Sequence, residues 1–155
     1  MQAILSLGCK LTGLLDRLGE FAPQLLFRLF IAYEFWEAGI EKFNGENWFT
    51  DFRGEFPFPF NIIPADISWF LATWTELAGA AAMVVGFATR FSAASLIILD
   101  IVAWYSVHAE NGYNVCSNGF KLPLIYLIVL IALLLSGPGK ASLDHFIKDK
   151  FCSAN

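Results

Sequence analysis

Charged residues are scarce in this chain of 155 residues. They make up 15% of the sequence, whereas soluble domains carry about 25%. Hydrophobic residues make up 57%, and the mean hydropathy is +0.57. The shortage of charge argues against an ordinary soluble domain and predicts a single integral membrane domain over residues 1–155. The net charge of −4 and the lack of a dense basic patch give no reason to expect nucleic-acid binding.

Cysteine and histidine are also rare. The three cysteines, Cys9, Cys116 and Cys152, are odd in number and show no C-x-x-C spacing, which argues against a disulfide framework or a structural zinc site. The two histidines, His108 and His145, are expected on opposite membrane faces, so we do not expect them to ligate one haem or metal together. The chain also lacks a P-loop, a nucleophile elbow and a dinucleotide-binding fingerprint.

Long apolar runs are abundant and predict four membrane-spanning helices. A span needs about 20 residues, and proline and glycine mark several of the limits. The leucines of residues 1–20 recur at helical spacing among charged residues, which predicts an interfacial amphipathic helix. The predicted fold is therefore an all-α, integral membrane four-helix bundle with an N-terminal interfacial helix. Its spans are residues 23–43, 64–87, 91–108 and 121–136, followed by a polar cytoplasmic tail over residues 137–155.

The distribution of lysine and arginine predicts the orientation of the bundle. Basic residues of the amino-terminal segment, the turn between the second and third spans, and the tail would share one side of the membrane. Fewer basic residues, Lys42, Arg53 and Lys121, fall on the other side. Because basic residues favour the cytoplasmic side, both termini are expected in the cytoplasm.

Three acidic residues, Glu34, Glu76 and Asp100, each lie near the middle of a different predicted span. A carboxylate at that depth costs roughly 2.5–3.5 kcal/mol on insertion scales. We expect all three to face the interior of the bundle at one depth, with Arg28 as the nearby cation. Glu37 and Glu41 share a helical face with Glu34 and would connect the site to the outer side. The candidate buried polar site consists of Arg28, Glu34, Glu37, Glu41, Glu76 and Asp100.

Three interpretations of these acids remain open. They could form a hydrogen-bonded cluster that fixes helix packing. They could form a proton- or cation-handling site or a redox ligand pocket, because ionisable residues inside a membrane are functional by default. One or more could instead face lipid in the protonated form.

A second candidate site lies near the end of the third span. His108, Glu110 and Cys116 could form a loose metal site on the outer face, since imidazole, carboxylate and thiolate are all metal ligands. Their spacing is not diagnostic, and the alternative is an ordinary histidine at the membrane interface.

Five short segments carry a family resemblance and follow one another in order between residues 23 and 147. They are Leu26–Leu29, Glu37–Phe43, Thr75–Ala80, Gly86–Arg90 and Gly137–Asp144. Together they resemble the DoxX family of small bacterial inner-membrane proteins. Many members have a histidine before the glycine of the first helix, where this chain has Ala38 before Gly39, so the role of that histidine cannot be transferred.

The resemblance implies a four-helix inner-membrane protein with cytoplasmic termini and an accessory role in a redox or metal-stress pathway. The family includes a subunit of thiosulfate:quinone oxidoreductase and proteins tied to oxidative or thiol stress. One branch accompanies copper-binding modified peptides, and the loop Asn111–Cys116 looks most like that branch. Quinone and copper are thus the implied ligands, and the lipid bilayer and other protein subunits the implied partners. The alternatives are a membrane subunit of a quinone-linked oxidoreductase and a small proton or metal transporter or assembly scaffold; whether the chain is an enzyme stays open.

Overall fold

Regular structure in this computed structural model is entirely helical over the described residues, 2–152. Side chains are described for residues 11–52 and 54–151. The α-helices are α1 (Gln2–Gly19), α2 (Ala22–Asn44), α3 (Phe49–Phe52), α4 (Ala65–Val85), α5 (Thr89–Ala103), α6 (Lys121–Ser136) and α7 (Leu143–Cys152). Shorter helical turns are η1 (Arg53–Glu55), η2 (Phe60–Ile62), η3 (Trp104–His108), η4 (Ala109–Asn111) and η5 (Val115–Ser117). The predicted all-α class is therefore confirmed.

Four of these helices, α2, α4, α5 and α6, correspond to the apolar runs predicted as spans. Proline lies in the first turn of α2 and immediately before α4, where a missing backbone N–H is tolerated. Gly86 ends α4 in the left-handed conformation, with φ of 70°, a geometry that favours glycine. Beyond Ala103 the helix widens into the π-helical turn η3, so that helical structure continues from α5 to Asn111.

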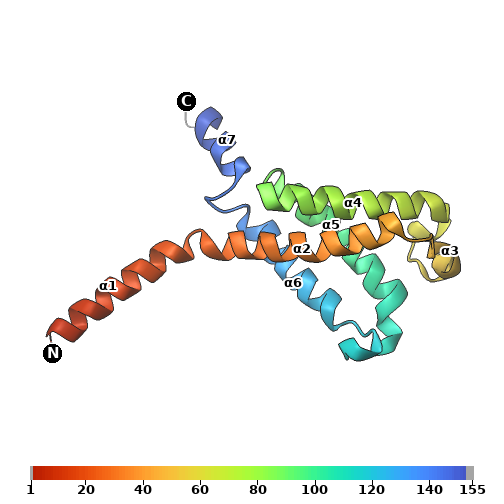
Figure 1. The fold of residues 1–155 in the computed structure, drawn as a ribbon, viewed down its shortest axis with the longest axis horizontal. Coiled ribbons are helices and arrows are strands. Elements are labelled where there is room, and N and C mark those ends of the chain that lie inside the picture. The colour runs from red at the N-terminus through yellow and green to blue at the C-terminus, as the bar shows by residue number, and fades with distance from the viewer. Residues whose placement is uncertain (1, 153–155) are drawn as a thin grey trace.

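The closest helix pair is α2 with α4, which lie side by side along the long axis of the molecule (Figure 1). Gly39 of α2 makes this approach possible, because an added Cβ would lie 2.8 Å from a methyl carbon of Leu77 in α4. Helix α5 packs against both α4 and α6, and α6 also contacts α2. The buried core between these helices consists of Ile31, Ala32, Phe35, Ala80, Met83, Ala93, Leu96, Leu130 and Leu133.

The segments that connect the helices lie at two opposite ends of the assembly. We call one end the terminal face, which carries residues 19–22, 86–89 and 137–144. The opposite end, the loop face, carries residues 45–64 and 109–120. Figure 1 shows α1 and α7 leaving from the terminal face, while α3 lies at the loop face.

Residues 137–155, predicted as a polar tail, contain the helix α7, and residues 153–155 lie outside the described part of the chain. Helix α7 is fixed to the terminal face by Asp144, whose two carboxylate oxygens accept the backbone N–H groups of Ala88 and Thr89 at 2.7 and 2.8 Å. The N–H of Asp144 in turn donates to the carbonyl of Gly86 at 3.0 Å. These contacts join segments more than 50 positions apart, so local periodicity could not reveal them.

The amino-terminal amphipathic segment forms α1, which projects away from the other helices (Figure 1). Leu11, Leu14, Leu15 and Leu18 are all exposed on it. An exposed leucine face suits a membrane interface, but the interfacial position itself remains a prediction. Residue 1 of the predicted segment lies outside the described residues.

The outer surfaces of α4, α5 and α6 are strongly apolar. Large hydrophobic side chains such as Phe70, Phe91, Ile101, Ile128 and Leu135 are exposed there. Within the described residues, two helical stretches, Ala65–Val85 and Thr89–Asn111, are long and apolar enough to cross a membrane, and α6 is a shorter apolar helix of 16 residues. Helix α2 is 23 residues long but carries five charged side chains.

Candidate functional site

Glu76 forms an ion pair with Lys42 between α4 and α2. The Lys42 Nζ donates to Oε1 of Glu76 at 2.9 Å, and Glu76 is only 2% exposed. The second carboxylate oxygen, Oε2, is buried and has no hydrogen-bond partner among the described residues. The buried charge is therefore compensated by one neighbour, while one acceptor position stays free for another donor.

This ion pair lies in the wall of a cavity of about 570 Å³ that reaches toward the loop face. The lining side chains of α4 and α5 are chiefly small or aliphatic, and aromatic side chains close the cavity from residues 45–64. The aromatic residues Trp48, Phe49, Phe56 and Trp69 pack edge to face, with ring centroids of neighbouring pairs 4.8–5.8 Å apart. Such packing holds an otherwise irregular segment over the cavity. The cavity is thus mostly apolar, with charged groups confined to one wall, which is typical of small-molecule sites.

His108 and Asn118 line the same cavity where it meets the loop between α5 and α6. The His108 ring nitrogen Nδ1 lies 2.8 Å from the carbonyl oxygen of Asn118, so this nitrogen donates and the neutral ring keeps Nε2 as an acceptor. His108 therefore lines this cavity, three residues before the helical stretch ends at Asn111.

The residues proposed as a metal site do not come together. Among the described residues, no group of three or more His, Cys, Asp or Glu side chains is placed to hold a metal ion. Cys116 is an exposed free thiol, and Glu110 is also exposed. The described donors do not form the ligand set that a copper ion needs, so we derive no chemistry through copper.

Asp100 and Glu34 belong to a second polar cluster, centred on Tyr126 of α6. The Tyr126 hydroxyl donates to Oε2 of Glu34 at 2.5 Å and lies within electrostatic range of Asp100 and Glu37. Asp100 is 4% exposed, and its Oδ2 has no hydrogen-bond partner among the described residues. The three acids predicted at mid-span are thus divided between two clusters, one with Lys42 and one with Tyr126.

Arg28 lies at the terminal face and has a different set of neighbours. It is 1% exposed, and its Nη2 donates to the carbonyl of Ala141 at 2.5 Å. It also interacts electrostatically with Asp144. Arg28 therefore supports the attachment of the carboxy-terminal segment, and Lys42 takes the role that the sequence assigned to Arg28.

Glu37 and Glu41 are exposed on α2, and only Glu41 lines the cavity. Glu41 lies within electrostatic range of Glu76. The acidic face of α2 thus extends to the cavity at Glu41. Among the described residues, no chain of hydrogen bonds joins these acids to one another.

Lys42 and Tyr126 are the site residues that the sequence reasoning missed. A signal was present for each. Lys42 lies three positions after Gly39 and seven after Phe35, on the α2 face that packs against α4. Tyr126 is a hydroxyl-bearing side chain in the middle of the apolar helix α6, and a buried tyrosine hydroxyl normally finds a partner.

Comparison of the amino-acid sequence with known proteins identifies relatives and a family. An uncharacterized protein of Haemophilus influenzae is 53% identical over 140 residues, which cover 90% of each chain. A second uncharacterized protein of the same organism is 26% identical over 139 residues, covering 84% of this chain and 96% of its own length. No solved structure matches. The DoxX family profile matches residues 24–109, which include Arg28, Lys42, Glu76, Asp100 and His108, and the chain therefore belongs to the DoxX family.

Proposed function

We propose that this protein is an inner-membrane accessory protein of a redox pathway, and that it binds a lipophilic quinone-type ligand in the cavity at the loop face. Four spans, α2, α4, α5 and α6, would cross the membrane, with the terminal face and both termini in the cytoplasm. The observation that carries the proposal is the Lys42–Glu76 ion pair in the wall of an aromatic and aliphatic cavity, with one Glu76 oxygen left without a partner.

The membrane arrangement is supported by surface chemistry. Exposed phenylalanine, leucine and isoleucine side chains over α4, α5 and α6 would be unfavourable against water, whereas lipid covers them at no such cost. Helix α2 carries more charge, but Lys42 neutralises Glu76 and Tyr126 binds Glu34. The charged groups that α2 brings to the interior are in this way partly compensated by its neighbours.

The fit of a quinone-type ligand follows from the lining of the cavity. An apolar ring and tail would replace water against side chains such as Leu71, Ile98 and Val102. At the polar wall, the Lys42 ammonium group would donate to a ligand carbonyl oxygen, while the free oxygen of Glu76 would accept from a ligand hydroxyl. A bound quinone supplies two-electron, two-proton chemistry, and Glu76 is a group at the polar wall that can hold a proton beside it. Electrons would come from a partner protein.

Ligand binding can be measured on the purified chain in lipid nanodiscs. We expect decylubiquinone to bind saturably and to quench tryptophan fluorescence, because Trp48 lines the cavity. Lys42→Met should weaken binding by about tenfold or more, the loss expected for a hydrogen bond to a charged group. Glu76→Gln should weaken binding of the reduced quinol more than binding of the quinone, because the amide no longer provides a carboxylate acceptor.

Matched variants outside the cavity control for changes in net charge. Lys121→Met and Glu46→Gln remove one charge each at the same face of the molecule, and neither residue lines the cavity. Both should bind decylubiquinone like the unchanged protein. Equal affinity in Lys42→Met and Lys121→Met would rule out the ion pair as a ligand contact, and an absence of saturable binding would rule out the quinone site.

A second candidate function is proton handling by the cluster around Tyr126. The supporting observation is the buried Asp100. Its Oδ2 has no hydrogen-bond partner among the described residues, and its carboxyl group lies within electrostatic range of the Tyr126 hydroxyl that donates to Glu34. Asp100→Asn should then abolish proton flux through reconstituted liposomes without changing decylubiquinone affinity. Liposomes that show no proton flux above protein-free controls would contradict this function and leave the quinone proposal unaffected.

A further inference from the structure

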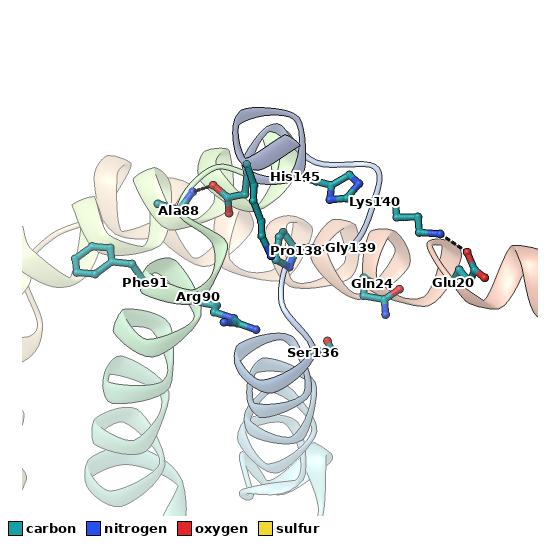
Figure 2. A pocket seen from close by; sticks show the side chains of 12 residues that line it. Glu20, Gln24, Ala88, Arg90, Phe91, Ser136, Pro138, Gly139, Lys140 and His145 are labelled. Atoms are coloured by element: carbon teal, nitrogen blue, oxygen red, sulfur yellow. Dashed lines mark hydrogen bonds and ion pairs between the residues drawn. The ribbon is translucent and has the colours of Figure 1, made fainter. Parts of the chain in front are cut away.

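A second cavity, of about 480 Å³, opens at the terminal face. It lies between the beginning of α2, the beginning of α5, the end of α6 and the helix α7 (Figure 2). The loop residues Pro138 and Gly139 form part of its wall, and the attachment of Asp144 to Ala88 sets α7 above it. This cavity shares no lining residue with the quinone-type cavity.

Basic side chains reach this cavity from three separate segments. Arg90 comes from α5, Lys140 from the loop after α6, and Lys148 from α7. His145 also lines it, and Figure 2 shows the side chains of Arg90, Lys140 and His145 arranged around the loop at Pro138. The fold thus gathers cations that lie up to 58 positions apart in the sequence, as the interval from residue 90 to residue 148 shows.

The two acids in the lining are already engaged. Glu20 forms an ion pair with Lys140, and the Asp144 carboxylate accepts two backbone N–H groups at the start of α5. Arg90 donates to the carbonyl of Leu135, at 3.4 Å. Within the part of the chain that the structure describes, neither Arg90 nor Lys148 has a carboxylate partner. Both side chains can therefore bind an added anion, and the lining as a whole carries one more basic residue (Arg90, Lys140, Lys148) than acid (Glu20, Asp144).

Large apolar side chains flank this basic cavity. Phe91, which lines it, is 75% exposed, and Leu135, next to the lining residue Ser136, is 74% exposed. A surface that combines two basic side chains with exposed apolar groups can bind a molecule with an anionic headgroup and hydrocarbon chains. With α5 and α6 spanning the membrane as proposed above, the cavity would lie at headgroup depth in the cytoplasmic leaflet.

We propose that this cavity binds the phosphate group of an anionic phospholipid, with Arg90 and Lys148 as the principal phosphate contacts. The planar guanidinium of Arg90 can donate two parallel hydrogen bonds to phosphate oxygens. The Lys148 ammonium group, on a flexible side chain of α7, adds a second positive charge beside the phosphate. The acyl chains would then run along Phe91 and Leu135. Free phosphate offers the same anionic chemistry but gains nothing from these two apolar side chains, which favours the lipid.

The test compares two lysines of the same helix. Lys148 lines the cavity, whereas Lys150, two residues further along α7, does not and lies over the rings of Phe146 and Phe151. Binding is measured on detergent-solubilised protein by native mass spectrometry, with dioleoylphosphatidylglycerol, dioleoylphosphatidylcholine and inorganic phosphate as separate probes. We expect phosphatidylglycerol to bind more tightly than phosphatidylcholine. Arg90→Gln and Lys148→Gln should each weaken phosphatidylglycerol binding about fivefold, the effect of one basic residue near an anionic lipid surface, and Lys150→Gln should leave it unchanged.

Each other outcome overturns a defined part of the proposal. Equal losses in Lys148→Gln and Lys150→Gln would show general surface attraction and no site. Inorganic phosphate that competes with phosphatidylglycerol at equal concentration would show a phosphate site without lipid selectivity. These results are independent of the quinone proposal, because the variants lie outside that cavity and the thermal midpoint in detergent serves as the folding control.

Discussion

The ammonium group of Lys42 lies 2.9 Å from Oε1 of Glu76, and this pair connects α2 to α4 one helical turn beyond the contact of Gly39 with Leu77. The backbone approach permitted by Gly39 and the ion pair thus occur on one seam between the two helices. Packing brings the charges together, and the charges in turn allow a carboxylate to remain inside an apolar assembly.

Removing one partner of this pair should destabilise the protein more than removing both. Lys42→Met leaves the carboxylate of Glu76 buried without a counter-charge, and breaking a buried pair in this way costs about 3–5 kcal/mol. The double variant Lys42→Met with Glu76→Gln removes that charge and should recover most of the thermal midpoint in detergent. Lys121→Met, at an exposed lysine, is the control. A double variant no more stable than Lys42→Met would show that the pair does not control stability.

The hydroxyl of Tyr126 should contribute measurably through its bond to Glu34. Tyr126→Phe removes one hydrogen bond to a carboxylate, and such bonds contribute about 1.5–3 kcal/mol. We expect the lower part of that range, because Glu34 is only half-buried and can bind water instead. Tyr105→Phe is the matched control, since Tyr105 is exposed. Equal shifts in thermal midpoint for the two variants would contradict a role for the bond.

Helix positions were largely predictable because each long helix carries its own local signals. The predicted segments 64–87 and 121–136 correspond closely to α4 and α6, which are bounded by Pro64, Gly86 and Gly137. Helix α7 was missed because its sequence is short and polar, and its position depends on Asp144 binding backbone groups of the α4–α5 turn. A contact between such distant segments leaves no periodic pattern in the local sequence.

The candidate site was predictable in its residue types but not in its pairing. Burial of Glu76 and Asp100 followed from their place in apolar runs. The sequence also suggested Arg28 as the cation beside these acids, and nothing local showed that it would instead donate to the carbonyl of Ala141. Pairing depends on helix rotation and on segments distant in sequence, and these are properties of the assembled fold.

Glu20 should titrate below its ordinary range. The hydrogen bond and the charge of Lys140 lower the pKa of this carboxyl group, which lies outside the helices proposed as spans. A lowered pKa in the folded state means that the pair stabilises the fold above the unfolded pKa and ceases to do so as the pH falls through the folded pKa. Carbon-13 NMR of labelled glutamate should show a low midpoint that rises in Lys140→Gln and stays unchanged in Lys150→Gln. A midpoint unaffected by Lys140→Gln would contradict the pairing.

Asp144 should control the attachment of α7. In Asp144→Asn, the amide can accept one of the two N–H groups of Ala88 and Thr89 but presents its own N–H₂ to the other. The buried Arg28 also loses its electrostatic interaction with this carboxylate. Together these losses should cost about 1–3 kcal/mol and speed proteolysis in residues 137–142, releasing α7. Asp149→Asn, further along α7, should not change the cleavage rate, and cleavage at the same rate in both variants would exclude Asp144 as the anchor.

Gly86 should be the least replaceable glycine of the terminal face. Its φ is +70°, and an added Cβ would clash with Nη1 of Arg28 and lie 2.6 Å from the Cβ of Ser142. Arg28 is too well buried to move aside, so Gly86→Ala combines backbone strain of about 1–3 kcal/mol with a steric clash. We expect a sharply lower yield of monodisperse protein. Gly13→Ala is the control and should stabilise the protein. An added Cβ at Gly13 meets no atom within 4 Å, and alanine favours the helix by about 0.5–1 kcal/mol relative to glycine. Size-exclusion profiles and helicity should therefore separate the two variants, and a Gly86→Ala protein that elutes and melts like the unchanged chain would show that Arg28 does not pack against this turn.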